Sequence, residues 1–483
     1  MNNTFRYIAL CMLIVFSGCE KYLEQTPDQR ATLNTTEKIA ELLATAYPKG
    51  DYITFAESIS DNAADKGGGT VDPLNQGPYQ FADVQSKEEG SPDFYWNSCY
   101  SAIAAANEAL HALSRLPEQE ASANLRGEAL VARAYAHFML VTFFSKVYDP
   151  ATASTDPGIP YVTEPETVVT ARYQRKTVQY VYDMIEKDLL EGLPLIKDSF
   201  YKIPKFHFNT LAANAFACRF YLFKHDYARA VTHANVAFPD QTIKSYLRPW
   251  NTTYAAYTYY ELQAAYTRSS ENANLLLVET PSTWGRSFAG YRYGLNTATL
   301  SQVLGINNPV GTALAYQVYG GTELVYNIPK FYEHFVREDA NAQIGDPYNM
   351  VPVLTSEEVL FNKAEASVEL GNYADAVDLI NIFLSTRIED YDPGSDALTA
   401  AKALSFYKTA DIKTALIQTI LNFKRGEFMH EGLRWFDMLR HDIPVSHNVL
   451  GTTTPIILGP NDPRRVFQIP QEATQAGIER NPR

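Results

Sequence analysis

Four charged residues near the C-terminus have a spacing that could do chemistry. Glu431, Arg434, Asp437 and Arg440 recur every third residue in the stretch FKRGEFMHEGLRWFDMLRH. On a helix such residues are neighbours, so the two carboxylates could act as an acid–base pair on a glycosidic bond. They could equally form a ladder of opposite charges. The alternating signs favour the ladder, because each carboxylate then has a guanidinium beside it.

Other motifs of catalysis and metal binding are incomplete. His430 precedes a glutamate, but no second histidine stands at the spacing of a zinc pair. The sequence contains neither a phosphate loop nor a Gly-x-Ser-x-Gly nucleophile elbow. The acidic, glycine-rich stretch 61–72 departs from a calcium-binding EF-hand, since Lys66 occupies the place of the turn glycine. We therefore expect no catalytic residue, no metal and no cofactor.

The first 19 residues have the order of a bacterial lipoprotein signal. Arg6 precedes an apolar run, residues 8–16, which is far shorter than the roughly 20 residues of a membrane-spanning helix. The small residues before Cys19 resemble a lipobox, in which the cysteine is acylated, although Phe16 stands where an aliphatic residue is usual. We predict a signal peptide at 1–18 and a palmitate-type lipid anchor on Cys19, which holds the protein on a membrane without crossing it.

Composition narrows the range of partners. The formal net charge is −14, which argues against nucleic acid, because phosphates need a basic surface. Besides Cys11 and Cys19, the chain has Cys99 and Cys218 in apolar helical contexts, which predicts buried free thiols. The 32 tyrosines are a surplus suited to surfaces that are partly apolar and partly hydrogen-bonding.

Apolar periodicity predicts a mainly helical chain interrupted by long loops. The stretch 124–147 is apolar nearly all round, which indicates a buried central helix, and the charges of Glu128 and Arg133 inside it should meet partners from neighbouring helices. Further helices are predicted from Thr36, after Ser91, around 178–189 and at 209–223, 226–238, 355–371, 373–388 and 410–430. Loops are predicted at 50–92, 149–175 and 239–350, with extended coil after Asp442.

Two of these helix pairs share a spacing. ELGNYADAVDLIN and FKHDYARAVTHANVAF both place a tyrosine just after a tight turn and small residues along the second helix. This resembles the tetratricopeptide helix-turn-helix, in which small residues let paired helices approach closely. Such pairs stack into a curved scaffold, each burying the apolar face of its neighbour.

The order of motifs resembles the SusD/RagB family of surface lipoproteins from Bacteroidetes-type bacteria. The matching stretches are CEKYLEQTP, GEALVARAYAHFMLVTFF, VLFNKAEASVELGN with AVDLINIFLSTR, FKRGEFMHEGLRWFDMLRH, and VFQIPQEA with the final NPR. The resemblance implies one SusD-like domain over 19–483. Its tetratricopeptide-like scaffold would occupy about 34–238 and 355–440, and loop insertions at about 50–95 and 239–350 would form the ligand face.

The resemblance also implies a function and a partner. Family members capture glycans at the cell surface and deliver them to a SusC-like TonB-dependent transporter in the outer membrane. Some members capture peptides instead, and the sequence does not separate these two ligands. A surface glycosidase and a purely structural lid for the transporter are also compatible with the sequence.

A glycan site needs rings to pack on sugar faces and short polar groups to bond hydroxyls. Two loop regions provide this combination. The first, 58–96, contains Asp61, Asn62, Asp65, Tyr79 and Trp96, of which Trp96 matches a tryptophan that helps build the sugar platform in the family. The second, 250–295, contains Tyr259, Tyr260, Trp284, Arg286 and Tyr291. We predict that these ten residues include the ligand contacts.

Overall fold

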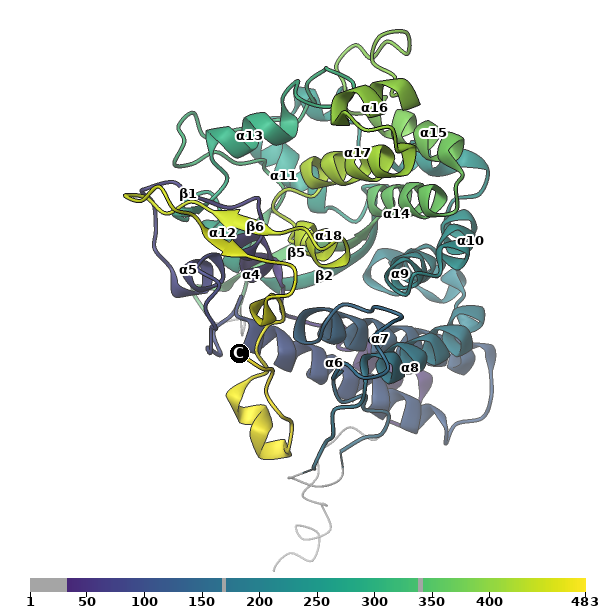
Figure 1. The fold of residues 1–483 in the computed structure, drawn as a ribbon. Coiled ribbons are helices and arrows are strands. Elements are labelled where there is room, and N and C mark those ends of the chain that lie inside the picture. The colour runs from purple at the N-terminus through teal and green to yellow at the C-terminus, as the bar shows by residue number, and fades with distance from the viewer. Residues whose placement is uncertain (1–32, 167–170, 338–341) are drawn as a thin grey trace, which may run out of the picture.

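The computed structural model describes residues 33–166, 171–337 and 342–483. The predicted signal peptide at 1–18 and the anchor residue Cys19 lie outside these ranges. Figure 1 shows two groups of helices, one below and one above a small central sheet. Among the described residues, none of the helices combines the length and the apolar character needed to cross a membrane.

The lower group is formed by the N-terminal part of the chain. Its helices are α3 (Thr36–Leu43), α6 (Pro92–Leu113), α7 (Glu120–Phe144) and α8 (Val178–Gly192). Helix α7 packs on each of the other three, and it is buried on every side from Gly127 to Phe144. This confirms the prediction of a central helix from a stretch that is apolar all round.

The two charges inside α7 have the partners that burial requires. Arg133 forms a bidentate ion pair with Asp188 of α8, with nitrogen–oxygen distances of 2.7 and 2.8 Å. Glu128 accepts a hydrogen bond from the Tyr47 hydroxyl at 2.7 Å, and His207 lies 2.8 Å from the same oxygen. The prediction of a partner from a neighbouring helix is thus confirmed for Arg133, whereas the partners of Glu128 come from the segments that follow α3 and η3.

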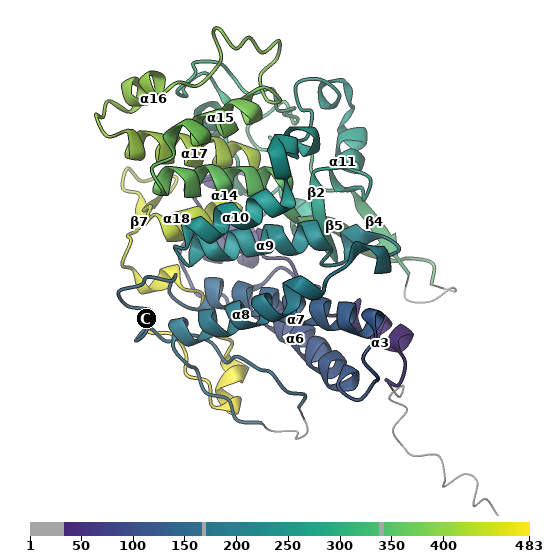
Figure 2. The same cartoon turned by 90° about the vertical axis from the view of Figure 1, so that its right-hand side faces the viewer.

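Helical hairpins continue the stack upward. They are α9 (Thr210–Phe223) with α10 (Tyr227–Ala237), and α14 (Ser356–Glu369) with α15 (Tyr373–Leu384). Helix α10 packs against α14, so the two hairpins lie side by side, as Figure 2 shows. The turn of the second hairpin uses Gly371 at φ +80°, while the first places His225 in the same left-handed region at φ +61°. The predicted tetratricopeptide-like pairs are confirmed.

The upper group is completed by helices that follow the second hairpin. These are α16 (Ala400–Tyr407), α17 (Ile412–Glu427) and α18 (Leu433–Arg440). Helix α17 packs on α14 and α15 and buries its face toward them. Short 3₁₀ turns lie between the larger elements, at η1 (Leu193–Leu195), η2 (Asp198–Phe200), η3 (Pro204–Phe206), η4 (Pro239–Tyr246), η5 (Tyr254–Ala256), η6 (Pro463–Arg465) and η7 (Gln471–Ala476).

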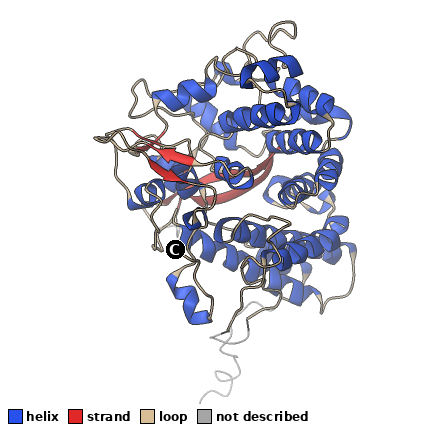
Figure 3. Cartoon of the chain, in the orientation of Figure 1, coloured by secondary structure: helices blue, strands red, loops and turns tan. Residues whose placement is uncertain are grey.

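A three-stranded antiparallel sheet lies between the two helix groups (Figure 3). Strand β5 (Asp346–Thr355) is central, flanked by β2 (Asn274–Pro281) and β4 (Glu333–Val336). In the described chain there are also two two-stranded pairs, β1 (Ala64–Asp65) with β3 (Tyr293–Gly294), and β6 (Val445–His447) with β7 (Ile456–Leu458). Strand β5 leads directly into α14, whose N-cap is Thr355.

The segments predicted as loops contain more structure than their composition indicates. The first holds α4 (Ile53–Ile59) and α5 (Pro73–Tyr79), and the second holds α11 (Tyr259–Thr267), α12 (Thr283–Ser287) and α13 (Thr297–Leu304) besides strands. Helix α5 has a proline in its first turn, where no backbone donor is needed. Its N-cap is Asp72, whose side chain accepts a hydrogen bond from the Leu74 amide at 2.8 Å. Helices this short display too few turns for apolar periodicity to be visible.

The predicted charge ladder is wrong in its partners. Glu431 precedes α18, and only Asp437 and Arg440 contact one another, at 3.1 Å. Each of the four charges pairs mainly with a residue of another element: Glu431 with Lys330, Arg434 with Asp61, Asp437 with Lys424 and Arg440 with Glu365. The role is structural as predicted, but the pairs join distant segments rather than stabilising one helix.

The last residues of the chain, 463–483, form what we call the C-terminal strap. It runs from the upper group down beside α6 (Figure 1). The Phe467 amide donates to the Phe143 carbonyl at 2.9 Å, and the Asn481 side chain donates to the Phe144 carbonyl at 3.0 Å. The strap thus satisfies carbonyl groups at the C-terminal end of α7. Cys99 and Cys218 are buried free thiols, as predicted.

Candidate functional site

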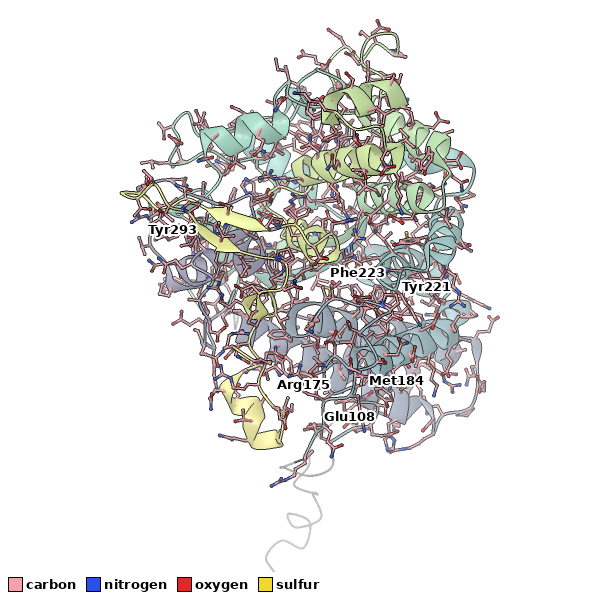
Figure 4. All side chains as sticks on the ribbon, in the orientation of Figure 1. Glu108, Arg175, Met184, Tyr221, Phe223 and Tyr293 are labelled. Atoms are coloured by element: carbon pink, nitrogen blue, oxygen red, sulfur yellow. The ribbon has the colours of Figure 1, made fainter. Side chains whose placement is uncertain are left out.

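The two predicted ligand regions meet in the structure. Strand β1 pairs with β3 so that Ala64 lies opposite Gly294 and Asp65 opposite Tyr293. Beyond this pair, Thr70 and Tyr291 form a parallel bridge. Segments more than 200 residues apart in the sequence therefore make one surface, on the left of the molecule in Figure 4, where Tyr293 is labelled.

A stack of three rings lies beneath this surface. The Tyr79 ring is sandwiched between Tyr293, with centroids 4.3 Å apart, and His447, at 4.1 Å. The Tyr79 hydroxyl accepts the Asp65 amide at 2.8 Å and donates to the Asn448 carbonyl at 2.7 Å. Tyr79 is only 1% exposed, so it positions Asp65 and the neighbouring loop rather than presenting a ring to solvent.

An ion pair joins the two segments at the surface. Arg292 donates from Nε and Nη2 to the two Asp65 oxygens at 2.7 and 2.9 Å. Burial raises the pKa of Asp65, but the bond to Arg292 and the Gly67 amide outweigh this, and the net pKa is lowered. The Arg292 side chain is 31% exposed, and its Nη1 donates to none of the described residues. Its free donors can therefore bond a ligand's hydroxyl groups.

A glycine-rich loop lies beside the ion pair. Lys66 donates to the carbonyls of Ala289 and Leu324 at 3.1 and 2.7 Å, and burial lowers its pKa to about 8. A β-carbon at Gly67 would lie 2.5 Å from the Leu450 side chain, and φ there is +76°. Glycine is therefore required for this close approach. We call the combined surface, residues 65–72, 291–292, 319–327 and 448–451, the loop face.

Tyrosines lie at the margin of the loop face. Tyr259 contacts Tyr260 and Tyr319 with ring centroids 5.3 and 5.2 Å apart. Tyr319 also bridges to Asn327 across the loop that carries Leu324. Tyr260 is 73% exposed, the most open ring among the predicted ligand residues. Of those residues, Tyr260 best matches the geometry that packing on a sugar needs.

The predicted tryptophans lie in the core instead. The Trp96 ring contacts Tyr100 and Phe144, each with centroids 4.9 Å away, and is 4% exposed. Trp284 is 2% exposed and packs on Phe288 and on Tyr291, another predicted ligand residue that is itself buried. Covered rings hold the loops in place, and their loss would destabilise the fold.

The remaining predicted ligand residues lie at two other positions in the fold. Asp61 pairs with Arg434, and Asn62 accepts a hydrogen bond from Arg425 at 2.9 Å. Arg286 lies apart from the loop face on α12, where its exposed guanidinium is 5.7 Å from the centre of the Phe335 ring and 3.5 Å from Glu333. Asp61 and Asn62 anchor the start of β1, whereas Arg286 belongs to the edge of the central sheet.

Sequence reasoning missed a groove of 640 Å³ along α17, which Arg425 and Arg434 also line. Gln418, Asn422 and Arg425 point into it from positions i, i+4 and i+7 of one helix, joined by Tyr407 from α16. That polar spacing is the signal that could have revealed it. Elsewhere in the described chain, no group of three or more acidic, histidine or cysteine side chains could hold a metal.

Comparison with known proteins places the chain in a family. A family model described as "Starch-binding associating with outer membrane" matches residues 21–222, and a SusD family model matches residues 324–477. The chain belongs to the SusD/RagB family. The family and its solved neighbours point to carbohydrate binding rather than to catalysis.

Solved SusD-like structures share this fold. A SusD superfamily protein and a SusD-like carbohydrate-binding protein, both from Bacteroides vulgatus ATCC 8482, have TM-scores of 0.68 and 0.67 at 18% and 16% identity. The matches cover 93% and 92% of this chain and 99% and 96% of those chains. A laminarin-binding SusD-like protein has a TM-score of 0.58 at 18% identity, over 93% of this chain and 99% of its own. No curated protein sequence matches significantly.

Proposed function

We propose that this protein is a lipid-anchored surface receptor that binds glycan on its loop face and passes it to a TonB-dependent transporter. The observation that carries the proposal is the union of two predicted regions around Asp65 and Arg292 in a chain of the SusD family. Two observations support it: Arg292 is partly exposed beside Asp65, and the exposed ring of Tyr260 contacts Tyr259, which packs on Tyr319 of the loop face. Aromatic rings can pack on the faces of sugars, and planar polar groups can hydrogen-bond their hydroxyls.

The ligand is tested by titration calorimetry of the chain without its signal peptide, with Cys19→Ser to keep it soluble. The panel contains laminarin, an α-glucan, other polysaccharides and peptides. We expect a polysaccharide to bind. Binding of peptides alone would replace glycan by peptide as the ligand, and release of new reducing ends would contradict a non-catalytic role.

The site is tested with Tyr260→Ala and Arg292→Ala. Each substitution should raise the dissociation constant of the glycan about ten-fold, which corresponds to a loss of about 1.4 kcal/mol in binding free energy. Tyr180→Ala on α8 is the matched control, because this tyrosine is also exposed but lies outside the loop face. If Gln418→Ala weakens binding and the loop-face variants do not, glycan binds in the groove along α17.

The anchor and the partner have separate tests. Metabolic labelling with palmitate should mark the wild-type chain and leave Cys19→Ala unlabelled. Purification from outer membranes in mild detergent should retain a TonB-dependent transporter with the chain. An unlabelled wild-type chain would remove the lipid anchor from the proposal without affecting glycan binding.

A further inference from the structure

A second groove lies far from the loop face. It measures 560 Å³ and lies between α6, the segments 160–166 and 171–175, and the C-terminal strap. Glu108, which lines it, is labelled near the bottom of Figure 4, well away from Tyr293. This groove is therefore not part of the site described above.

Hydrogen bonds fix the walls of the groove. The Tyr173 amide donates to the Ala476 carbonyl at 2.9 Å, and Asn97 of α6 donates to Glu472 of the strap at 3.1 Å. Arg175 donates from Nη1 to the Glu479 carbonyl at 3.0 Å. Because all three walls are tied together, the groove is preformed and needs little ordering when it is filled.

The floor is apolar and the rim is acidic. Ile103, Val162 and Ile478 line the interior, with the small, exposed Ala104 between them. Glu108 and Glu164 stand on the rim, and no described residue forms an ion pair or side-chain hydrogen bond with either carboxylate. The groove thus offers apolar contact flanked by two negative charges without counter-ions.

A sugar does not fit this chemistry. Trp96 reaches the groove, but Tyr100 and Phe144 pack against its ring, so the faces of Trp96 are covered, and the rings of Tyr100 and Tyr173 are only partly exposed. The hydroxyls of Tyr100 and Tyr173 are already bonded, to the Pro160 carbonyl and to Glu166. Apart from the Ser101 hydroxyl, the described side-chain groups of the groove left without a partner are the two carboxylates above an apolar floor.

We infer that this groove docks an extended segment of a partner protein that alternates apolar and basic side chains. The apolar side chains fill the space over Ala104, and the basic ones neutralise Glu108 and Glu164. Complementary charge at the rim gives register and specificity, while apolar burial supplies most of the affinity. The inference is independent of the glycan function, because it uses another surface.

The probe is an eight-residue peptide of alternating leucine and arginine, measured by fluorescence anisotropy. Two comparison peptides replace arginine by glutamate or leucine by glycine. We expect only the first to bind the groove. Equal binding of the glycine–arginine peptide would show mere attraction to an acidic protein and would overturn the inference, as would no binding of the leucine–arginine peptide.

Variants separate the groove from general charge attraction. Ala104→Trp fills the groove without changing its charge. It should lower the affinity for the leucine–arginine peptide at least about ten-fold. The double variant Glu108→Gln with Glu164→Gln should lower this affinity about five-fold, as expected for the loss of two exposed ion pairs. The control, Glu118→Gln with Glu191→Gln, changes charge equally at exposed sites elsewhere and should have no effect.

Two further outcomes decide the matter. Full binding by Ala104→Trp, with unchanged circular dichroism, would overturn the inference. Competition by a neutral oligosaccharide would assign the groove to sugar instead. Glycan binding at the loop face, measured on the same Ala104→Trp protein, should be unchanged, so failure of either proposal is recognised separately.

Discussion

The two helix groups are held together by different physics. Around α7 the contacts are ring on ring: Phe138 lies within 6.4 Å of Tyr182, Phe216, Phe220 and Phe223, measured between ring centroids. Around α14 and α17 the interior also holds rings, such as Phe361 on Phe383, but they are joined by a chain of linked ion pairs. The fully buried Arg387 pairs with Glu427 at 2.7 Å and with Glu357 at 3.2 Å. Glu357 also pairs with Arg248 at 2.9 Å.

This difference predicts how strongly single substitutions destabilise each region. Apolar contacts are numerous and individually replaceable, so a core of rings tolerates the loss of a few atoms. A buried ion is tolerated only with its partner, because an unpaired charge in the interior is costly. The upper group should therefore respond to single substitutions more sharply than the lower group.

The largest effect should come from Arg387→Met. It leaves Glu427 and Glu357 with one counter-ion fewer in the interior, and we expect a loss of about 3–5 kcal/mol in the free energy of unfolding. Urea denaturation measures it. Lys187→Met, which breaks an exposed pair with Glu191, is the control and should change stability by about 0.5 kcal/mol or less. A loss below about 1 kcal/mol for Arg387→Met would contradict an ionic core.

Acid should weaken the ionic contacts at the start of β1. Burial raises the pKa of Asp61, but the guanidiniums of Arg434 and Arg425 overcome this and lower it from 3.8 to about 2. A depressed pKa stabilises the fold above pH 4, and this contribution disappears as pH falls toward 2. It amounts to about 2 kcal/mol, and Asp61→Asn should lack that part of the acid dependence. Identical urea midpoints against pH for both proteins would refute this assignment.

The ring core should respond more mildly. Phe138→Leu keeps an apolar side chain in α7, and we expect a loss of about 1–2 kcal/mol. Thermal and urea unfolding should show the same loss at low and high salt, because no charge is involved. A loss larger than that of Arg387→Met would reverse the proposed contrast between the two groups.

The smallest effect concerns the turns of the two hairpins. His225→Gly relieves a left-handed backbone position and should stabilise the protein by about 0.5 kcal/mol. Gly371→Ala at the equivalent turn should destabilise it by about 1 kcal/mol. Calorimetry on both variants tests the pair; a stabilising Gly371→Ala would show that the two turns are not equivalent.

The helical scaffold was predictable because its signals are local. The paired motifs around Tyr227 and Tyr373 carry periodicity over several turns, and the structure has hairpins at both places. Ionic partners were not predictable in this way. Glu431 pairs with Lys330, 101 positions earlier, although Arg434 stands only three residues away. Spacing identifies neighbours along a helix, but it does not identify what packs against it.

The candidate site shows the same division. Composition located both loop regions, yet the Asp65–Arg292 pair spans 227 positions and depends on the tertiary fold. The exposure of individual aromatic rings was even less predictable from the sequence. Trp284 and Tyr260 belong to the same tyrosine-rich stretch, but one is 2% and the other 73% exposed. Residue type alone does not separate a ring that supports a loop from one that is open to a ligand.

The C-terminal strap has a consequence for how this chain acquires its shape. Asn481 closes a contact with Phe144 across 337 positions. Contacts between residues so far apart form late, since the intervening chain must first be brought together. During synthesis α7 can form early, but the carbonyls of Phe143 and Phe144 gain these partners only after residues 467 and 481 have been made. An early helix is thus completed by residues far along the chain, so the fold around α7 matures only after those residues have been made.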